Sequence, residues 1–161
     1  MHIKKIVVSG VALVVGLVLM ASAAGSASPA TVLKADTLAG VSGPYVGSTN
    51  PIRGVNGGGV AWNIAKGKAV LAADGTLEVK VEGLVLATTG TNPVTSFRAL
   101  VSCQTIVDDA AAVVNVSTAA FPASTRGDSK IAATVSLPSP CFAPIVFVTS
   151  PGGSWFAVTG V

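Results

Sequence analysis

Apolar and polar residues alternate through much of the chain after residue 60. The clearest case is residues 76–86, where apolar side chains stand at every second position from Leu77 to Val81, with charged residues between them. A period of two is typical of a strand with one buried and one solvent-facing side. We therefore predict a strand here. The Asp74-Gly75 turn signal joins it in a hairpin to another strand at residues 68–72.

Further strand-like segments are separated by turn-forming residues. They lie at 96–103, 113–118, 129–137, 145–149 and 155–159, with a hairpin loop at 150–154. No segment after residue 27 keeps a helical period over three turns, although the alanine-rich residues 109–112 could form one helical turn. Short strands at this spacing predict an all-β chain, folded as an immunoglobulin-like Greek-key β-sandwich of about seven or eight strands.

The N-terminus has the pattern of a secretory signal peptide. Lys4 and Lys5 precede an apolar run at residues 6–20, and small residues follow up to Ala27. We predict a signal peptide at residues 1–27 and a secreted, extracellular protein, with cleavage after residue 23, 24 or 27. The alternative is an uncleaved leader that anchors the chain in a membrane. After the leader we predict no membrane span, a flexible Ser/Ala/Thr/Gly-rich lead-in at residues 28–50, and a single domain at residues 51–161.

Removing the leader changes the charge balance. The remaining chain has eight Lys and Arg against seven Asp and Glu, a net charge of +1, although the pI of the whole sequence is about 9.1. This near-neutral total predicts no nucleic acid or other polyanion as a partner. The only histidine, His2, is lost with the leader.

The cysteine and histidine counts limit the chemistry. Cys103 and Cys141 are the only cysteines, and an even number in an exported chain predicts a disulfide between them. Two free thiols or a two-cysteine metal site are the alternatives, but no histidine remains to complete a metal site or a catalytic triad. We expect no metal, no cofactor and no enzyme activity.

Carboxylates are the remaining candidates for catalysis. Asp108, Asp109 and Glu82 could serve a hydrolase, but sequence neighbours on a strand point apart, and residues 108–109 are typical of a solvated turn. The tripeptide Arg126-Gly127-Asp128 matches an adhesion motif and is also ordinary turn chemistry, which we favour.

Three aromatic residues beside glycine-rich segments are candidate ligand contacts. Tyr45, Trp62 and Trp155 could present ring faces to a glycan or an apolar molecule. The competing interpretation places the tryptophans in the core, where a small sandwich needs large apolar side chains.

Three stretches carry a resemblance, at residues 50–59, 96–103 and 141–160. Through them residues 45–161 resemble secreted, uncharacterised β-rich proteins of actinomycete-type soil bacteria, a resemblance that implies no catalytic or binding residue. The composition is also similar to that of the chromoprotein antibiotic carriers, small exported immunoglobulin-like sandwiches that bind an apolar ligand and use two disulfides.

These observations predict a secreted, non-catalytic β-sandwich of the cell envelope or extracellular space that binds an unknown ligand. The first alternative is a carrier of a small apolar molecule or glycan, with the ligand near Trp62 and Trp155. A carboxylate-based hydrolase is the second. The oligomeric state stays open.

Overall fold

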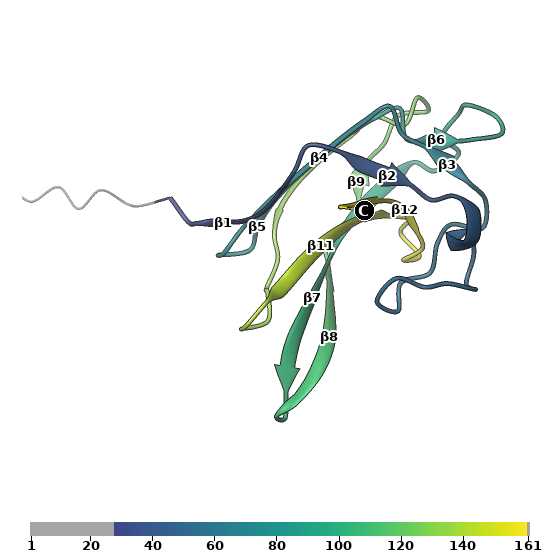
Figure 1. Cartoon of the computed structure of the whole chain (residues 1–161). Coiled ribbons are helices and arrows are strands. Elements are labelled where there is room, and N and C mark those ends of the chain that lie inside the picture. The colour runs from purple at the N-terminus through teal and green to yellow at the C-terminus, as the bar shows by residue number, and fades with distance from the viewer. Residues whose placement is uncertain (1–27, 161) are drawn as a thin grey trace, which may run out of the picture.

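The computed structural model describes residues 28–160, and this part of the chain is all-β, as the alternation predicted (Figure 1). One short 3-10 helix, η1, spans Gly43–Tyr45. The strands are β1 Thr31–Ala35, β2 Leu38–Gly40, β3 Trp62–Asn63, β4 Lys66–Ala72, β5 Thr76–Glu82, β6 Val85–Leu86, β7 Ser96–Val107, β8 Ala110–Ser117, β9 Phe121–Pro122, β10 Ser129–Thr134, β11 Phe142–Thr149 and β12 Trp155–Thr159.

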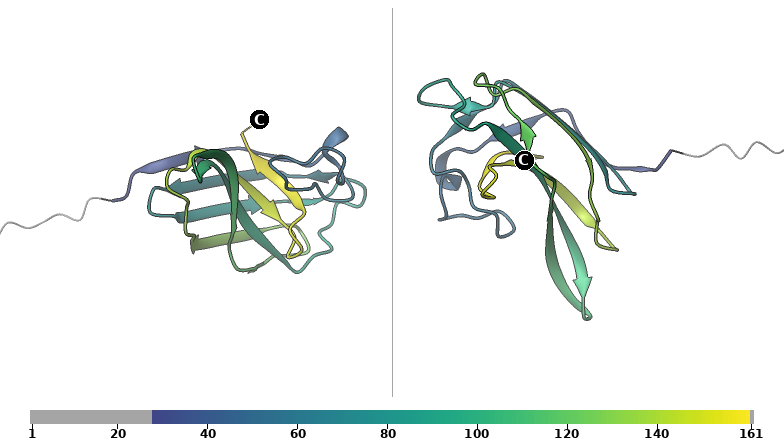
Figure 2. Two further views of the ribbon diagram at one scale, coloured as in Figure 1. Left: turned by 90° about the horizontal axis from the view of Figure 1, so that it is seen from below. Right: turned by 180° about the vertical axis from the view of Figure 1, so that it is seen from behind.

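Two antiparallel sheets make up most of the described structure. The first has four strands in the order β1-β4-β5-β10, which we call the front sheet. The second has six strands, in the order β2-β12-β11-β7-β8 with β9 added to β7, and is called the back sheet here. Strands β3 and β6 form a separate two-stranded pair. Figure 2 shows the back-sheet strands crossing those of the front sheet, so the two sheets form layers of a β-sandwich.

The core lies between the layers, and strand alternation explains which side chains fill it. In β4 and β5 buried and non-buried residues alternate, so that Leu71, Leu77 and Val79 point inward while the charged residues between them face solvent. The back sheet supplies Phe97 and Phe147, both fully buried. The strand prediction for residues 68–72 is confirmed, and the strand predicted at residues 76–86 ends at Glu82, with Val85–Leu86 forming the separate strand β6.

The disulfide links two neighbouring interior strands of the back sheet. Cys103 and Cys141 are bonded, as predicted, with their Cα atoms 5.0 Å apart. Cys103 lies in β7, and Cys141 directly precedes β11, whose first residue Phe142 pairs with Gln104. Beyond this point β7 continues with β8 as a two-stranded hairpin that projects from the sandwich (Figure 1).

The lead-in expected at residues 28–50 needs correction. It contains two strands: β1 pairs with β4 at the edge of the front sheet, and β2 pairs with β12 at the edge of the back sheet. Their neighbour Val41 is fully buried. Strands of five and three residues are too short to show periodicity, which is why composition alone indicated a loop. The domain therefore begins before residue 51.

The predicted leader, residues 1–27, lies outside the described residues. Within residues 28–160, no helix has both the length and the apolar character that a bilayer crossing requires.

Candidate functional site

Trp62 lies inside the core, and its side chain is only 4% exposed. Its ring stacks on Phe156 with centroids 3.9 Å apart and meets the edge of Phe97 at 6.4 Å. Gly58 makes this packing possible, because a Cβ at that position would come within 3.1 Å of the Phe156 ring and 3.2 Å of the Trp62 indole nitrogen. The Trp62 ring is therefore a structural group and offers no face to a ligand.

Trp155 is also buried, with 2% of its side chain exposed. Its neighbour Phe156 is buried as well, although neighbouring side chains on a strand point to opposite faces, because the glycine-rich segment at residues 56–58 covers β12. Backbone hydrogen bonds join Trp155 to Asn56 and Gly58. Tyr45 remains 41% exposed, with its ring 6.4 Å from that of Trp155. The structure thus brings Tyr45 and Trp155 together but leaves only Tyr45 accessible.

The three candidate carboxylates occupy different environments. Asp108 and Asp109 form the two-residue turn between β7 and β8, both with positive φ, at the tip of the projecting hairpin. Glu82 lies on the front sheet, where its carboxylate pairs with Lys80. Within residues 28–160, no group of three or more His, Cys, Asp or Glu side chains is arranged to hold a metal ion.

A row of lysines crosses the solvent-facing side of the front sheet. Lys80 of β5 is paired directly with Lys68 of β4 on one side and with Lys130 of β10 on the other. Directly paired residues share a face, and their Cβ atoms lie about 4.5–5.5 Å apart. We call Lys68, Lys80 and Lys130 the lysine row. Like charges directly opposite each other destabilise a sheet, so the arrangement works against folding.

The rest of this face adds to the positive charge. Lys34 of β1 pairs with Val70, and Lys66 of β4 pairs with Glu82, so the face holds five lysines against Glu78 and Glu82. The other charged residues after the leader are three arginines and five aspartates. Residues 28–161, with a net charge of +1, thus separate their charge, with an excess of three positive charges on these strands. The total charge conceals this separation, and the prediction of no polyanion partner, which rested on that total, did not take this face into account.

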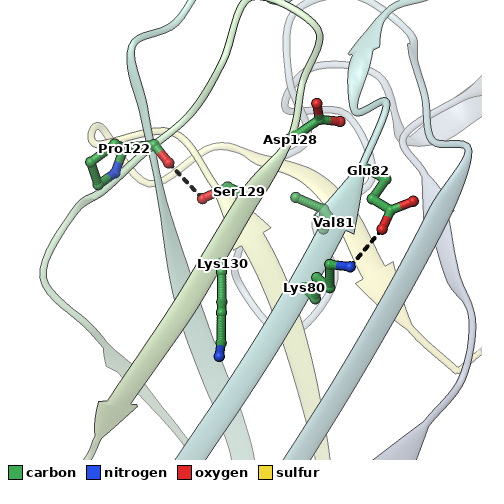
Figure 3. Close-up of a pocket in the computed structure, with 7 residues that line it drawn as sticks. All are labelled: Lys80, Val81, Glu82, Pro122, Asp128, Ser129 and Lys130. Carbon is green, nitrogen blue, oxygen red and sulfur yellow. Dashed lines mark hydrogen bonds and ion pairs between the residues drawn. The ribbon is translucent and has the colours of Figure 1, made fainter.

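One ion pair partly neutralises the lysine row. The Lys80 ammonium lies 2.7 Å from a Glu82 carboxylate oxygen, and the Lys66 ammonium lies 3.7 Å from the other oxygen (Figure 3 shows the first contact). The hydrogen bond from Lys80 lowers the pKa of Glu82, and the same bond raises the pKa of Lys80. Among the described residues, Lys68 and Lys130 have no carboxylate partner, so both keep a free positive charge.

Shallow depressions surround the row. One, of about 510 Å³, lies between Lys80 and Lys130 and is drawn in Figure 3 with Asp128, Ser129 and Pro122. Two others, of about 270 and 470 Å³, adjoin Lys68 and also include Lys80. The face is therefore hollowed on both sides of Lys80 but encloses no deep cavity, a shape that suits an extended ligand.

The turn at Arg126-Gly127-Asp128 borders the first depression. Gly127 has a φ of 81°, and Asp128 accepts a hydrogen bond from the Gly83 backbone N–H at 3.0 Å. Arg126 and Asp128 are themselves paired, with 3.5 Å between Nε and the carboxylate oxygen. The tripeptide is therefore a turn that attaches the start of β10 to the end of β5, as the turn interpretation predicted.

Sequence reasoning missed the lysine row. The sequence shows that all three lysines stand at polar positions of alternating segments. It does not show the register between β5 and β10, which places Lys80 beside Lys130. Comparisons with protein-family models, curated proteins and solved structures found no match. The resemblance to secreted actinomycete proteins therefore stays a prediction.

Proposed function

We propose that this chain is a non-catalytic, exported binding module that holds a linear phosphate-bearing polymer along the lysine row. The observation that carries the proposal is the direct cross-strand pairing of Lys68, Lys80 and Lys130. Mutual repulsion of these ammonium groups disfavours the empty face, and a bound polyanion would relieve it. Lysine suits such a ligand, because its flexible stem lets a point charge follow phosphates of varied position.

The shape of the face favours a polymer over a small anion. Neighbouring strands are about 4.8 Å apart, so the row spans roughly 10 Å from β4 to β10. A chain with a phosphate in each repeat could contact all three lysines at once, with each ammonium group on a different phosphate. The open depressions beside Lys80 leave such a chain free to enter and leave the row at both ends.

The same face offers little to other ligand classes. Strands β1, β4, β5 and β10 carry no aromatic residue, so they provide no surface for stacking sugar rings or unpaired bases. The exposed apolar side chains Val32 and Val70 are short and lack the aromatic groups that anchor proteins at a membrane interface. A charge-driven polymer contact remains the best fit.

Export and the absence of catalysis complete the proposal. The Cys103–Cys141 disulfide is typical of an oxidising compartment, and residues 1–27 have the pattern of a cleaved leader. Asp108 and Asp109 lie on the hairpin tip. Glu82 and Asp128 line one depression, but Glu82 is held by Lys80, and Asp128 is held by Arg126 and by the Gly83 N–H, so we assign none of these carboxylates a catalytic role. The mass of the chain recovered from the culture medium tests export, and loss of 23 to 27 residues is the expected result.

Binding of fluorescently labelled inorganic polyphosphate tests the proposed function. The full-length gene is expressed in an exporting bacterium, and the recovered protein is titrated by fluorescence anisotropy over a range of salt concentrations. With three lysine–phosphate contacts, log K should fall with log salt at a slope of about −2. The triple variant K68Q/K80Q/K130Q should bind at least about tenfold more weakly.

A charge-matched variant provides the control. K34Q/R53Q/R126Q removes the same number of positive charges but leaves the lysine row and the three depressions beside it intact, and it should keep affinity within about threefold of the parent. Equal losses in the two variants would show that net charge, and not the row, governs binding. No binding of polyphosphate at low salt, or binding to anionic vesicles alone, would overturn the proposal.

A further inference from the structure

The hairpin of β7 and β8 extends beyond the rest of the back sheet (Figures 1 and 2). The described pairing of β11 with β7 reaches Gln104, whereas β7 and β8 pair as far as Val107 and Ala110. We call residues 104–113 the arm. On the arm and at its base, four large apolar side chains are between 46% and 55% exposed: Ile106, Val107, Val113 and Phe142.

Three of these side chains share one face of the arm. Gln104 pairs with both Val113 and Phe142, and Ile106 pairs with Ala111 two positions along the same strand. Paired residues and their second neighbours lie on the same side of a sheet. Ile106, Val113 and Phe142 therefore form an exposed apolar surface, with a shallow depression of about 420 Å³ among them.

Strand β8 is also an open edge of the back sheet. It pairs with β7 alone, so half of its eight residues direct their backbone N–H and C=O groups away from the sheet. Its sequence, AAAVVNVS, contains no charge, proline or glycine. Charged side chains and proline are among the features by which proteins normally prevent a strand edge from pairing with another chain.

The other edge strands of the two main sheets, β1, β10 and β2, show such protection, and β9, which also flanks β7, has only two residues, one of them a proline. The edge strand β1 has an irregular register and carries Lys34, while β10 carries Lys130. At the opposite edge of the back sheet, β2 has only three residues. The unprotected edge is thus specific to β8 and is continuous with the exposed apolar surface of the arm.

We propose that β8 pairs with β8 of a second copy of this chain in an antiparallel two-fold dimer. The two back sheets would then form one continuous sheet, and the apolar surfaces of the two arms would lie side by side. Strand addition satisfies the free backbone groups of both edges at once. The absence of charge along β8 lets the strand face itself without repulsion.

The charges around β8 favour this antiparallel arrangement. Pairing in opposite directions separates the two acidic tips, Asp108-Asp109, and places each one near the Asn115–Ser117 end of the partner strand. Arg53 lies at that end, where the Asn115 side chain donates to its carbonyl and its guanidinium donates to the Ser102 carbonyl. No described carboxylate lies within ion-pair distance of Arg53 in the single chain. Parallel pairing would instead bring the acidic tips together.

Sedimentation velocity over about 1–300 µM tests the dimer, because an interface formed by one strand pair and a small apolar surface belongs to the weaker class. The protein recovered from an exporting host should change from monomer to dimer within this range. Val113→Lys introduces a protective charge at the edge and should weaken association at least about tenfold. The matched variant Val70→Lys, at an exposed valine on the front sheet, should leave association unchanged.

Hydrogen–deuterium exchange identifies the surface involved. Amides of β8 should exchange more slowly at high than at low protein concentration, while those of β2, the opposite edge of the same sheet, should not change. A folded Val113→Lys variant that dimerises like the parent would overturn the proposal. A protein that stays monomeric at all concentrations, or protection that spares β8, would do the same. No polyanion is present, so the result is independent of the proposed function.

Discussion

Removing the disulfide gives the most quantitative test of how the described domain is stabilised. Cys103 and Cys141 are 38 positions apart, and the closed loop contains β8, β9 and β10. Because the disulfide restricts the unfolded chain, closing a loop of this length should stabilise the folded state by about 4 kcal/mol. Because small domains have total stabilities of about 5–15 kcal/mol, C103A/C141A should remain folded but with a much smaller free energy of unfolding.

Urea unfolding followed by tryptophan fluorescence measures this difference, since Trp62 and Trp155 are both buried in the folded state. The variant should unfold at lower urea and with a steeper dependence on denaturant, because an uncrosslinked unfolded chain exposes more surface. A reductant should lower the parent's stability to that of the variant and leave the variant unchanged. A difference below about 1 kcal/mol would refute the reasoning that the bridge acts on the unfolded chain.

Three further predictions follow from individual contacts. Trp62→Ala should lower the free energy of unfolding by about 3–5 kcal/mol and leave the polyphosphate affinity of the folded fraction unchanged. Weaker binding at equal stability would show that Trp62 contacts the ligand. Gly58→Ala should cost about 1–3 kcal/mol in urea unfolding, because its Cβ meets the Phe156 ring, and a neutral effect would contradict that packing. Since Lys80 lowers the pKa of Glu82, their ion pair should favour folding at neutral pH, and this contribution should disappear as the pH falls through the lowered pKa. The difference in melting temperature between the parent and Glu82→Gln should therefore shrink below pH 4, and a constant difference would contradict the pair.

Alternation predicted the strands that have one wet and one buried face. Strands β5 and β10 lie within predicted segments, and β4 begins two residues before its predicted segment, because each alternates polar and apolar residues over six or seven positions. The disulfide followed from the even count of cysteines in a chain with a predicted leader. The sequence pattern was insufficient where tertiary contacts determine the secondary structure. Residues 110–112 are alanines with high helix propensity, yet they form the start of β8 because β7 lies beside them.

The candidate site was less accessible to sequence reasoning. Burial of Trp155 depends on the segment around Gly58, about a hundred residues earlier in the chain, and no local pattern reports that contact. The lysine row depends on registers, one within the β4–β5 hairpin and one between strands separated by about 50 residues. A shift of one residue in either register would move a lysine out of the row. Net charge, summed over the chain, could not reveal it.

Amine acetylation with mass-spectrometric readout tests the central claim most directly. Each lysine of the exported protein is labelled with an acetylating reagent, with and without inorganic polyphosphate, and the rates are compared residue by residue. The account predicts that Lys68, Lys80 and Lys130 become several-fold slower to react, while Lys34, at the edge strand of the same face, changes much less. Equal slowing of all lysines, or none, would contradict a polyanion site on the lysine row.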